Sequence, residues 1–228
     1  MCKTILLVAV FLHALPAFGQ EPELNANQRL VLACHQLDVS AVVRLLRSGA
    51  DVNARFGSKD VKQFFQDPWF GGWPVEASQW TPLQALAHSS AYPPPKRNFE
   101  NTVEHLDWAR TEQEKIPKTE IAIRSERQVQ VTNILLSHGC ELNAADDRGA
   151  TALYCSIYAK HERMVLTLLD YSPEVNTKTG LYIDGTYNTT PLHRAYWSAK
   201  ITNRLMELGA NDNARDSDGN TPKQWRER

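Results

Sequence analysis

The chain repeats a six-residue phrase, which is most complete as Thr-Pro-Leu-His-Arg-Ala at residues 190–195. Partial copies of this phrase lie at 81–86, 151–156 and 221–225. The threonine can cap a helix with its hydroxyl, and proline fits the first helical position because no backbone donor is required there. The leucine and the alanine are three residues apart and therefore share one face of the helix. Each copy predicts the start of a short helix whose apolar face packs against a neighbour.

A second pattern alternates with the first and consists of a leucine-rich stretch, a turn and an asparagine. It occupies residues 45–54, 135–144, 168–176 and 206–214. Gly139 and Gly209 stand where the leucine-rich stretch ends, which predicts a helix end with a positive φ. Gly149 and Gly219 stand in the turn that leads to the next copy of the phrase. The ordered alternation of the two patterns predicts a series of helix pairs.

Together the two patterns resemble the ankyrin repeat, and the resemblance extends over residues 20–228. It implies an all-α solenoid of about four helix-turn-helix repeats, followed by a C-terminal half-repeat cap. The implied repeats cover about 25–55, 81–145, 146–178 and 190–214, and the half-cap covers 219–228. In this family the histidine of the phrase bridges backbone groups by hydrogen bonds, so the resemblance implies that role for His193. Trp225 would cover the last apolar face of the stack.

Two insertions interrupt the repeats. The first, residues 56–80, lies in the link between repeats one and two and is rich in aromatic residues. The second, residues 90–127, lies inside repeat two, between its helices. Apolar residues at helical spacing predict a helix over 98–115, and a long helix is expected over 119–137. The second insertion is expected to be either a structural buttress or a further contact surface.

The aromatic residues of the first insertion form the candidate partner-binding site. They are Phe64, Phe65, Trp69, Phe70 and Trp73. Exposed apolar patches commonly mark interaction sites, and aromatic side chains are enriched at interface cores. Three interpretations stay open: the insertion docks a partner, folds back over the first two repeats, or stacks on a glycan or at a membrane interface. Trp80 is expected to pack at the turn, and the loops near 146–150, 180–188 and 214–220 would form the rim of the binding surface.

The N-terminus predicts export. Residues 1–19 resemble a signal peptide, with Lys3, an apolar run over 5–15 and small residues before a predicted cleavage site at Gln20. The apolar run would span ~16 Å of a ~30 Å hydrocarbon core, so a transmembrane span is not expected. An uncleaved anchor is the alternative. We therefore expect a mature chain, residues 20–228, that is secreted or periplasmic.

Charge, cysteines and motifs narrow the functional class further. The 25 Lys and Arg residues balance the 26 Asp and Glu residues, and there is no basic stripe, so nucleic-acid binding is not expected. Cys34, Cys140 and Cys155 are irregularly spaced and are expected to be small core residues, although one disulfide stays open. The sequence holds no known catalytic motif and no Cys-x-x-Cys pair. We expect no enzyme activity, no cofactor and no metal site.

The histidines are expected to have ordinary roles. His88, His138 and His161 are predicted at helix ends, where water can satisfy their rings. His105 lies beside Glu104 and Asp107, and this trio could bind a metal, but a solvated charged face is the expectation. The sequence as a whole predicts an exported, monomeric scaffold that binds another protein through its concave face and inter-repeat loops. The alternative is an envelope-binding or glycan-binding module that uses the aromatic insertion.

Overall fold

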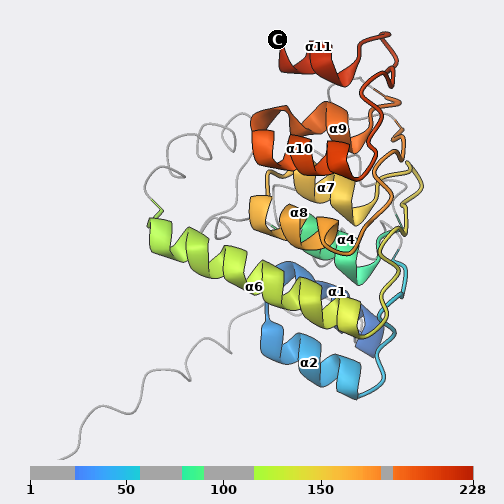
Figure 1. The fold of residues 1–228 in the computed structure, drawn as a ribbon. Coiled ribbons are helices and arrows are strands. Elements are labelled where there is room, and N and C mark those ends of the chain that lie inside the picture. Colours follow the sequence, from blue (N-terminus) through green and yellow to red (C-terminus); the bar gives the residue numbers. More distant parts are fainter. Residues whose placement is uncertain (1–23, 57–78, 90–115, 181–186, 228) are drawn as a thin grey trace, which may run out of the picture.

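The computed structural model describes residues 24–56, 79–89, 116–180 and 187–227 (Figure 1). Nearly all of its regular structure is helical. In chain order the helices are α1 (Ala26–Gln36), α2 (Val39–Arg47), α4 (Pro82–Ala87), α6 (Lys118–Ser137), α7 (Ala152–Tyr158), α8 (Glu162–Leu169), α9 (Pro191–Arg194), the 3-10 turn η4 (Ala195–Trp197), α10 (Ala199–Glu207) and α11 (Pro222–Arg226). Two isolated antiparallel bridges, Phe56 with Trp80 and Ala145 with Thr151, lie in the links between repeats.

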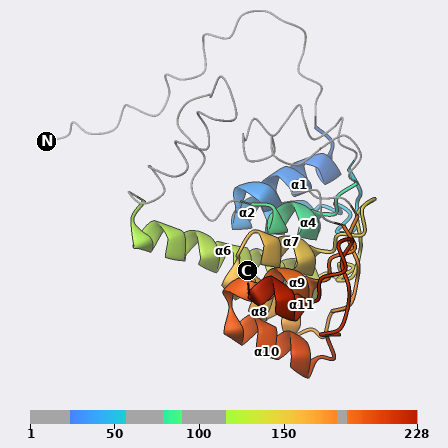
Figure 2. The same cartoon turned by 90° about the horizontal axis from the view of Figure 1, so that it is seen from above.

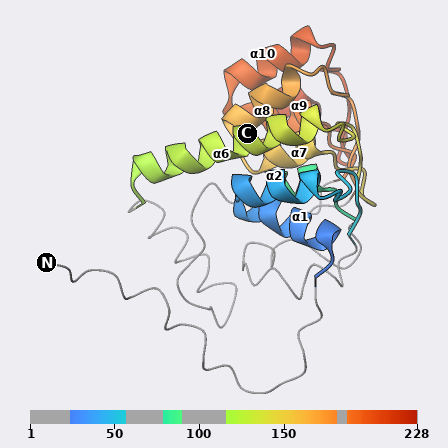
Figure 3. The same cartoon turned by 90° about the horizontal axis from the view of Figure 1, so that it is seen from below.

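The helices form two layers of successive pairs. The first helices of the pairs, α1, α4, α7 and α9, pack against one another in that order, and α11 packs on α9 at the end of the row. The second helices, α2, α6, α8 and α10, form the other layer (Figures 1 and 2). The links between pairs run along one edge of the stack, which we call the loop edge (Figure 3). The all-α solenoid of four helix pairs and a half-repeat cap is therefore confirmed.

The helix starts and ends follow from the two sequence patterns. The Thr81 and Thr151 hydroxyls accept the backbone N–H groups three residues later, each at 3.3 Å. Proline occupies the first helical position in α4, α9 and α11. Gly139 and Gly209 have φ values of 78° and 85°, as expected for residues that end a helix. The polar phrase and the glycines thus fix the helix boundaries, and the leucines between them fix the buried face.

The core is a column that runs the length of the stack. Leu83, Leu153 and Leu192 each stand two residues after a cap threonine in successive first helices, and each is about 1% exposed. Leu168 and Leu205 occupy matching positions in the second helices and are fully buried. Burying a leucine side chain contributes about 1.5–3 kcal/mol, so every pair depends on its neighbours for most of its stability.

The first repeat departs from the pattern as a terminal repeat should. Asn25 replaces the threonine cap and exchanges hydrogen bonds with Gln28, both at 2.9 Å. Asp38 caps α2 by accepting the Ala41 N–H at 2.9 Å, as expected. Leu45, in the second helix, is only partly buried, and the described residues add no further layer below it. Stability at this end therefore depends on one neighbouring repeat instead of two.

Helix α6 is much longer than the other second helices. It has 20 residues, against 8 in α8 and 9 in α10. Its buried residues lie between Gln128 and Leu135, whereas the half that begins at Lys118 projects from the stack (Figure 1). The long helix expected over 119–137 is thus present, and the helix expected over 98–115 lies outside the described residues. None of the helices in the described part of the chain is both long and apolar enough to cross a membrane.

Candidate partner-binding surface

Asparagine side chains connect successive links along the loop edge. Asn53 donates its side-chain N–H to the Gly139 carbonyl at 3.3 Å and accepts the Glu141 N–H at 2.7 Å. Two repeats further along the chain, Asn176 makes the same pair of bonds: it donates to the Gly209 carbonyl at 3.0 Å and accepts the Asn211 N–H at 2.8 Å. Between them, the Asn143 side chain accepts the Glu174 N–H at 2.9 Å. Each link is therefore held in register with the next by bonds to its backbone.

The fourth residue of each phrase provides a second connection. Gln84 donates to the Ala150 carbonyl at 2.8 Å, and the Tyr154 hydroxyl is hydrogen-bonded to that of Thr189 at 2.6 Å. His193 Nε2 lies 3.1 Å from the Asn220 carbonyl. In all three cases the partner directly precedes the cap threonine of the next repeat. Three different side chains thus connect equivalent points of successive repeats.

The bridging role expected for His193 is confirmed. Its Nδ1 accepts the Thr190 N–H at 3.1 Å, so Nε2 carries the proton that is donated to Asn220. Gln84 does the same with an amide, since its oxygen accepts the Thr81 N–H at 2.8 Å. Burial lowers the pKa of His193, so the ring is neutral at pH 7 and fits this pattern of one acceptor and one donor.

A pair of substitutions at His193 separates hydrogen bonding from packing. We expect His193→Gln to change the free energy of unfolding by less than about 1 kcal/mol, because glutamine can make both bonds, as Gln84 does. His193→Leu should cost about 2 kcal/mol, because a buried N–H and a carbonyl lose their partner. Urea denaturation followed by circular dichroism measures both values. Equal losses of unfolding free energy for the two variants would show that the hydrogen bonds of His193 do not contribute to stability.

Aspartates shape the turns that present the links. Asp146 accepts the N–H groups of Arg148 and Ala150 at 2.9 and 2.8 Å. Burial raises the pKa of Asp146 despite these bonds. Asp216 occupies the equivalent turn and also accepts the indole N–H of Trp225 at 2.7 Å. Burial acts to raise its pKa as well, but the bond from Trp225 and those from the backbone outweigh it and lower the pKa. Both carboxylates therefore serve the fold.

The C-terminal cap packs on a buried arginine. Arg194 is 6% exposed, and its Nε donates to the Tyr154 hydroxyl at 2.9 Å. Its guanidinium carbon lies 4.6 Å from the centre of the Trp225 ring and 5.5 Å from that of Tyr158. The Trp225 ring also meets the His193 ring edge-on at 6.2 Å. The expectation that Trp225 covers an apolar face is thus wrong, because the ring makes cation–π and edge contacts with polar side chains instead.

The base of the aromatic insertion is fixed in the structure. The backbones of Phe56 and Trp80 exchange two hydrogen bonds, at 3.1 and 3.0 Å. Both side chains are buried and share a small second core with Val31, Ala54 and Ala85. The packing role expected for Trp80 is therefore confirmed. The insertion leaves and rejoins the described structure at one point of the loop edge, between the first two repeats.

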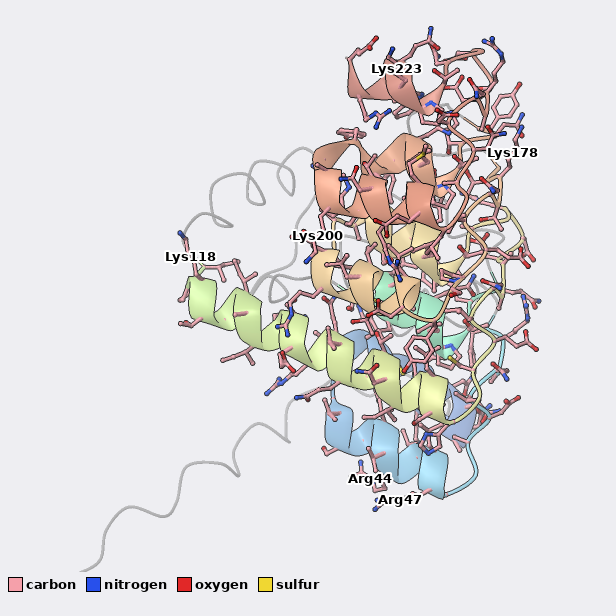
Figure 4. All side chains as sticks on the ribbon, in the orientation of Figure 1. Arg44, Arg47, Lys118, Lys178, Lys200 and Lys223 are labelled. Carbon is pink, nitrogen blue, oxygen red and sulfur yellow. The ribbon has the colours of Figure 1, made fainter. Side chains whose placement is uncertain are left out.

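The residues singled out within that insertion lie outside the described part of the chain. Phe64, Phe65, Trp69, Phe70 and Trp73 therefore stay a prediction. The described loop edge adds residues that the sequence indicated only as ranges. Tyr187 is 47% exposed, and its carbonyl accepts the Ser217 N–H at 2.9 Å, which holds it beside the next link. Lys178 also lies on this edge, whereas Lys118 and Lys200 lie on the opposite side of the stack (Figure 4).

Two histidines differ from expectation. His161 is 6% exposed, and His88 stacks on Trp80 with 4.3 Å between ring centres, so water does not satisfy these rings as predicted. His138 is exposed and bonds the Ile134 carbonyl at 2.8 Å, as a helix-end residue should. His105 lies outside the described residues. Within the described ranges, no three His, Cys, Asp or Glu side chains are grouped so that they could hold a metal ion.

The cysteines are packed as free thiols. Cys34 and Cys155 are buried, and Cys140 is partly buried. Burial raises the pKa of Cys140 to about 12, and it raises the pKa of the other two thiols as well. Thiols with raised pKa values are poor nucleophiles at neutral pH. The prediction that all three are small core residues is confirmed for Cys34 and Cys155, whereas Cys140 is only partly buried.

Comparison with known proteins agrees with this architecture. Residues 119–216 match the family model for ankyrin repeats in three copies. The zebrafish (Danio rerio) protein named ankyrin repeat and SOCS box protein 11 is similar to this chain, with 38% identity over 91 residues. That match covers 39% of this chain and 29% of the relative, so it reaches less than a third of the relative's length. The paired helices, the connected links and these matches show that the chain is an ankyrin-repeat protein.

Proposed function

We propose that this protein is an exported scaffold that binds another protein through its loop edge and concave face. Ankyrin repeats imply a protein-interaction scaffold, and proteins of this family are generally not catalytic. The observation that carries the proposal is the hydrogen-bonded connection of successive links by Asn53, Asn143 and Asn176. A surface that is already ordered loses little conformational entropy when a partner docks.

The aromatic insertion supplies the anchor in this proposal. The chain enters and leaves it at the Phe56–Trp80 bridge, which belongs to the loop edge. Buried aromatic side chains at the centre of an interface commonly account for most of the binding energy. Lys178 lies on the same edge (Figure 4), and Tyr187 is held beside the next link by the bond from Ser217, so both would form part of the polar rim. The N-terminal segment, residues 1–19, supports export because it resembles a signal peptide.

Removing two anchor side chains tests the proposal. A Trp69→Ala/Trp73→Ala double variant should bind the natural partner at least about 10-fold more weakly, because loss of an interface hot spot costs 2 kcal/mol or more. The unfolding midpoint should stay unchanged. The partner is first recovered by affinity capture with the mature protein, and its dissociation constant is then measured. Export is tested separately, on the native full-length chain, because its exported form should begin at Gln20.

A matched control uses an exposed aromatic residue elsewhere. Tyr196 lies in η4, in the turn between the two helices of the fourth repeat, and is 50% exposed, so Tyr196→Ala should leave binding unchanged. A double variant with unaltered affinity but a lower unfolding midpoint would contradict the proposal and favour packing of the insertion against the repeats. Loss of binding to envelope glycan, with protein capture retained, would favour the glycan-binding alternative.

A further inference from the structure

Three cations occupy the same position in three of the four links along the loop edge. They are Arg55, Lys178 and Arg215, and each is the sixth residue after the positive-φ residue that ends a second helix. The link between repeats two and three has Ala145 at this position. All three cations are exposed, and we call them the cation row. Because the repeats are stacked in register, equivalent positions form a line along the stack.

The cation row is unpaired but partly ordered. Within the described part of the chain, no carboxylate forms an ion pair with any of the three side chains. Arg55 Nη1 donates to the Ala145 carbonyl at 3.0 Å, and Arg215 Nη1 donates to the Gly219 carbonyl at 2.7 Å. A guanidinium has five N–H donors, so both arginines keep donors for a ligand. Side chains that are already held in place lose less entropy when they bind.

Acidic residues stand on both sides of the cation row. Asp51, Glu141 and Glu174 are the second residue after the positive-φ position of their links, and all three are exposed. Asp147 and Asp218 are also exposed and lie nearer the following cap threonine. A wide and uniformly charged polyanion on the row would cover these carboxylates as well and be repelled by them. The row therefore suits a narrow ligand whose negative charges are separated.

The spacing of the row follows from the repeats. Packed helices lie about 8–10 Å apart, so neighbouring links are separated by about that distance. Lys178 and Arg215 are in neighbouring links, and Arg55 is two links before Lys178. A polyproline II segment has three residues per turn and rises about 3.1 Å per residue, so one turn covers about 9 Å. Every third side chain of such a segment points the same way and would meet the next link.

We propose that the cation row binds an acidic segment of a protein partner in the polyproline II conformation. The segment has carboxylates at positions i, i+3 and i+9, opposite Arg215, Lys178 and Arg55, and an uncharged residue at i+6, opposite Ala145. In the opposite chain direction the carboxylates are at i, i+6 and i+9. This inference rests on the proposed protein-binding function and names the chemistry of the partner. It does not depend on the aromatic insertion, because its residues belong to the links themselves.

Selection of peptides from a random displayed library on the complete mature chain tests the proposal. Enriched peptides should carry Asp or Glu at the stated spacing. They should bind an Arg55→Gln/Lys178→Gln/Arg215→Gln variant at least about 10-fold more weakly, because all three ion pairs are lost at once. Raising the NaCl concentration from about 50 to about 300 mM should weaken binding to the wild type and change binding to the variant much less. Fluorescence polarisation with labelled peptides measures each dissociation constant.

A matched control removes the same net charge from the other side of the stack. Lys118 and Lys200 lie opposite the loop edge, and Arg44 lies in α2 of the second layer (Figure 4). An Arg44→Gln/Lys118→Gln/Lys200→Gln variant should bind the selected peptides as the wild type does. Both triple variants should keep the unfolding midpoint of the wild type, because all six side chains are exposed.

Several outcomes would overturn the proposal. One is a selection that yields no peptide with a preference for the wild type over the cation-row variant. Another is equal binding of peptides in which the carboxylates are moved to adjacent positions. Heparin that binds the cation row as tightly as the peptides would assign the row to polyanions instead.

The natural partner separates this inference from the proposed function. A captured partner whose dissociation constant is the same for the wild type and the cation-row variant contradicts the role of the row and leaves the scaffold function intact. Peptides that depend on the row, together with affinity capture that recovers no protein, support the chemistry of the row and count against the scaffold function.

Discussion

Gly149→Ala should lower the free energy of unfolding by about 3 kcal/mol, whereas Gly219→Ala should lower it by about 1 kcal/mol. The two glycines occupy the same place in two equivalent turns, two residues before a cap threonine, and have φ values of 77° and 80°. Alanine meets the same backbone penalty at both positions, because a left-handed conformation is unfavourable for residues with a Cβ. The difference between the two variants therefore isolates what each Cβ touches.

The surroundings of the two positions are very different. A Cβ at Gly149 would lie 2.6 Å from the Lys178 carbonyl oxygen, whereas one at Gly219 would have no neighbour within 4 Å. The Lys178 backbone cannot move freely, because the next link is tied to this turn by a bond from the Gly180 N–H to the Arg148 carbonyl. Relief of the clash must therefore separate the link between repeats two and three from the link between repeats three and four, which adds about 2 kcal/mol.

Asparagine substitutions provide the control, and urea denaturation measures all four variants. Asparagine tolerates a positive φ but still carries a Cβ. Gly219→Asn should therefore be close to wild type, whereas Gly149→Asn should remain strongly destabilised. If Gly149→Ala and Gly219→Ala cost the same, the close approach of the two links contributes nothing and only the backbone conformation matters.

The repeat architecture could be predicted because its determinants are local in sequence. Thr81, Thr151 and Gly139 act on groups within a few residues of themselves, so their roles can be recognised without coordinates. The asparagine connections are different. Asn53 and Asn176 recur visibly in the second pattern, but their partners lie in the following link, and sequence spacing does not indicate which backbone groups face them.

The incorrect predictions concern contacts between repeats. His161 was expected in water because it stands at a helix end, and in an isolated helix pair that end would be exposed. Here α6 is longer than α8, its Gln128 bonds Ser89 at this edge, and His161 is only 6% exposed. Trp225 was expected on apolar surface, but the residue beneath it is Arg194, whose burial depends on Tyr154 in the preceding repeat.

The candidate site also has a part that could be predicted from the sequence and a part that could not. The repeat register predicts where the aromatic insertion begins and ends, and the Phe56–Trp80 bridge lies at that place. The insertion itself has no equivalent in the other repeats, so their geometry gives no information about Trp69 or Trp73. Its position in the array is thus known from the repeats, and its use as a docking segment is a proposal that binding measurements must test.

Three equivalent leucines should give a graded series of stability losses. Leu45, Leu168 and Leu205 each stand four residues before the residue with positive φ that ends the second helix of their repeat. Leu168→Ala should lower the free energy of unfolding by about 3–4 kcal/mol, because it opens a cavity in a fully buried site. Helix α8 packs against both α6 and α10, so the surroundings of Leu168 cannot collapse to fill the space.

The other two positions provide the comparison, with urea denaturation as the measurement. Leu205 is equally buried, but among the described helices α10 has a second-layer neighbour on one side only, so Leu205→Ala should cost about 2–3 kcal/mol. Leu45 is partly exposed already, and Leu45→Ala should cost about 1–2 kcal/mol. In a stack where each repeat is stabilised only by its neighbours, the cost of the same deletion must rise from the ends to the middle. A Leu45→Ala variant as unstable as Leu168→Ala would mean that the first repeat is buried by more than the one repeat it contacts here.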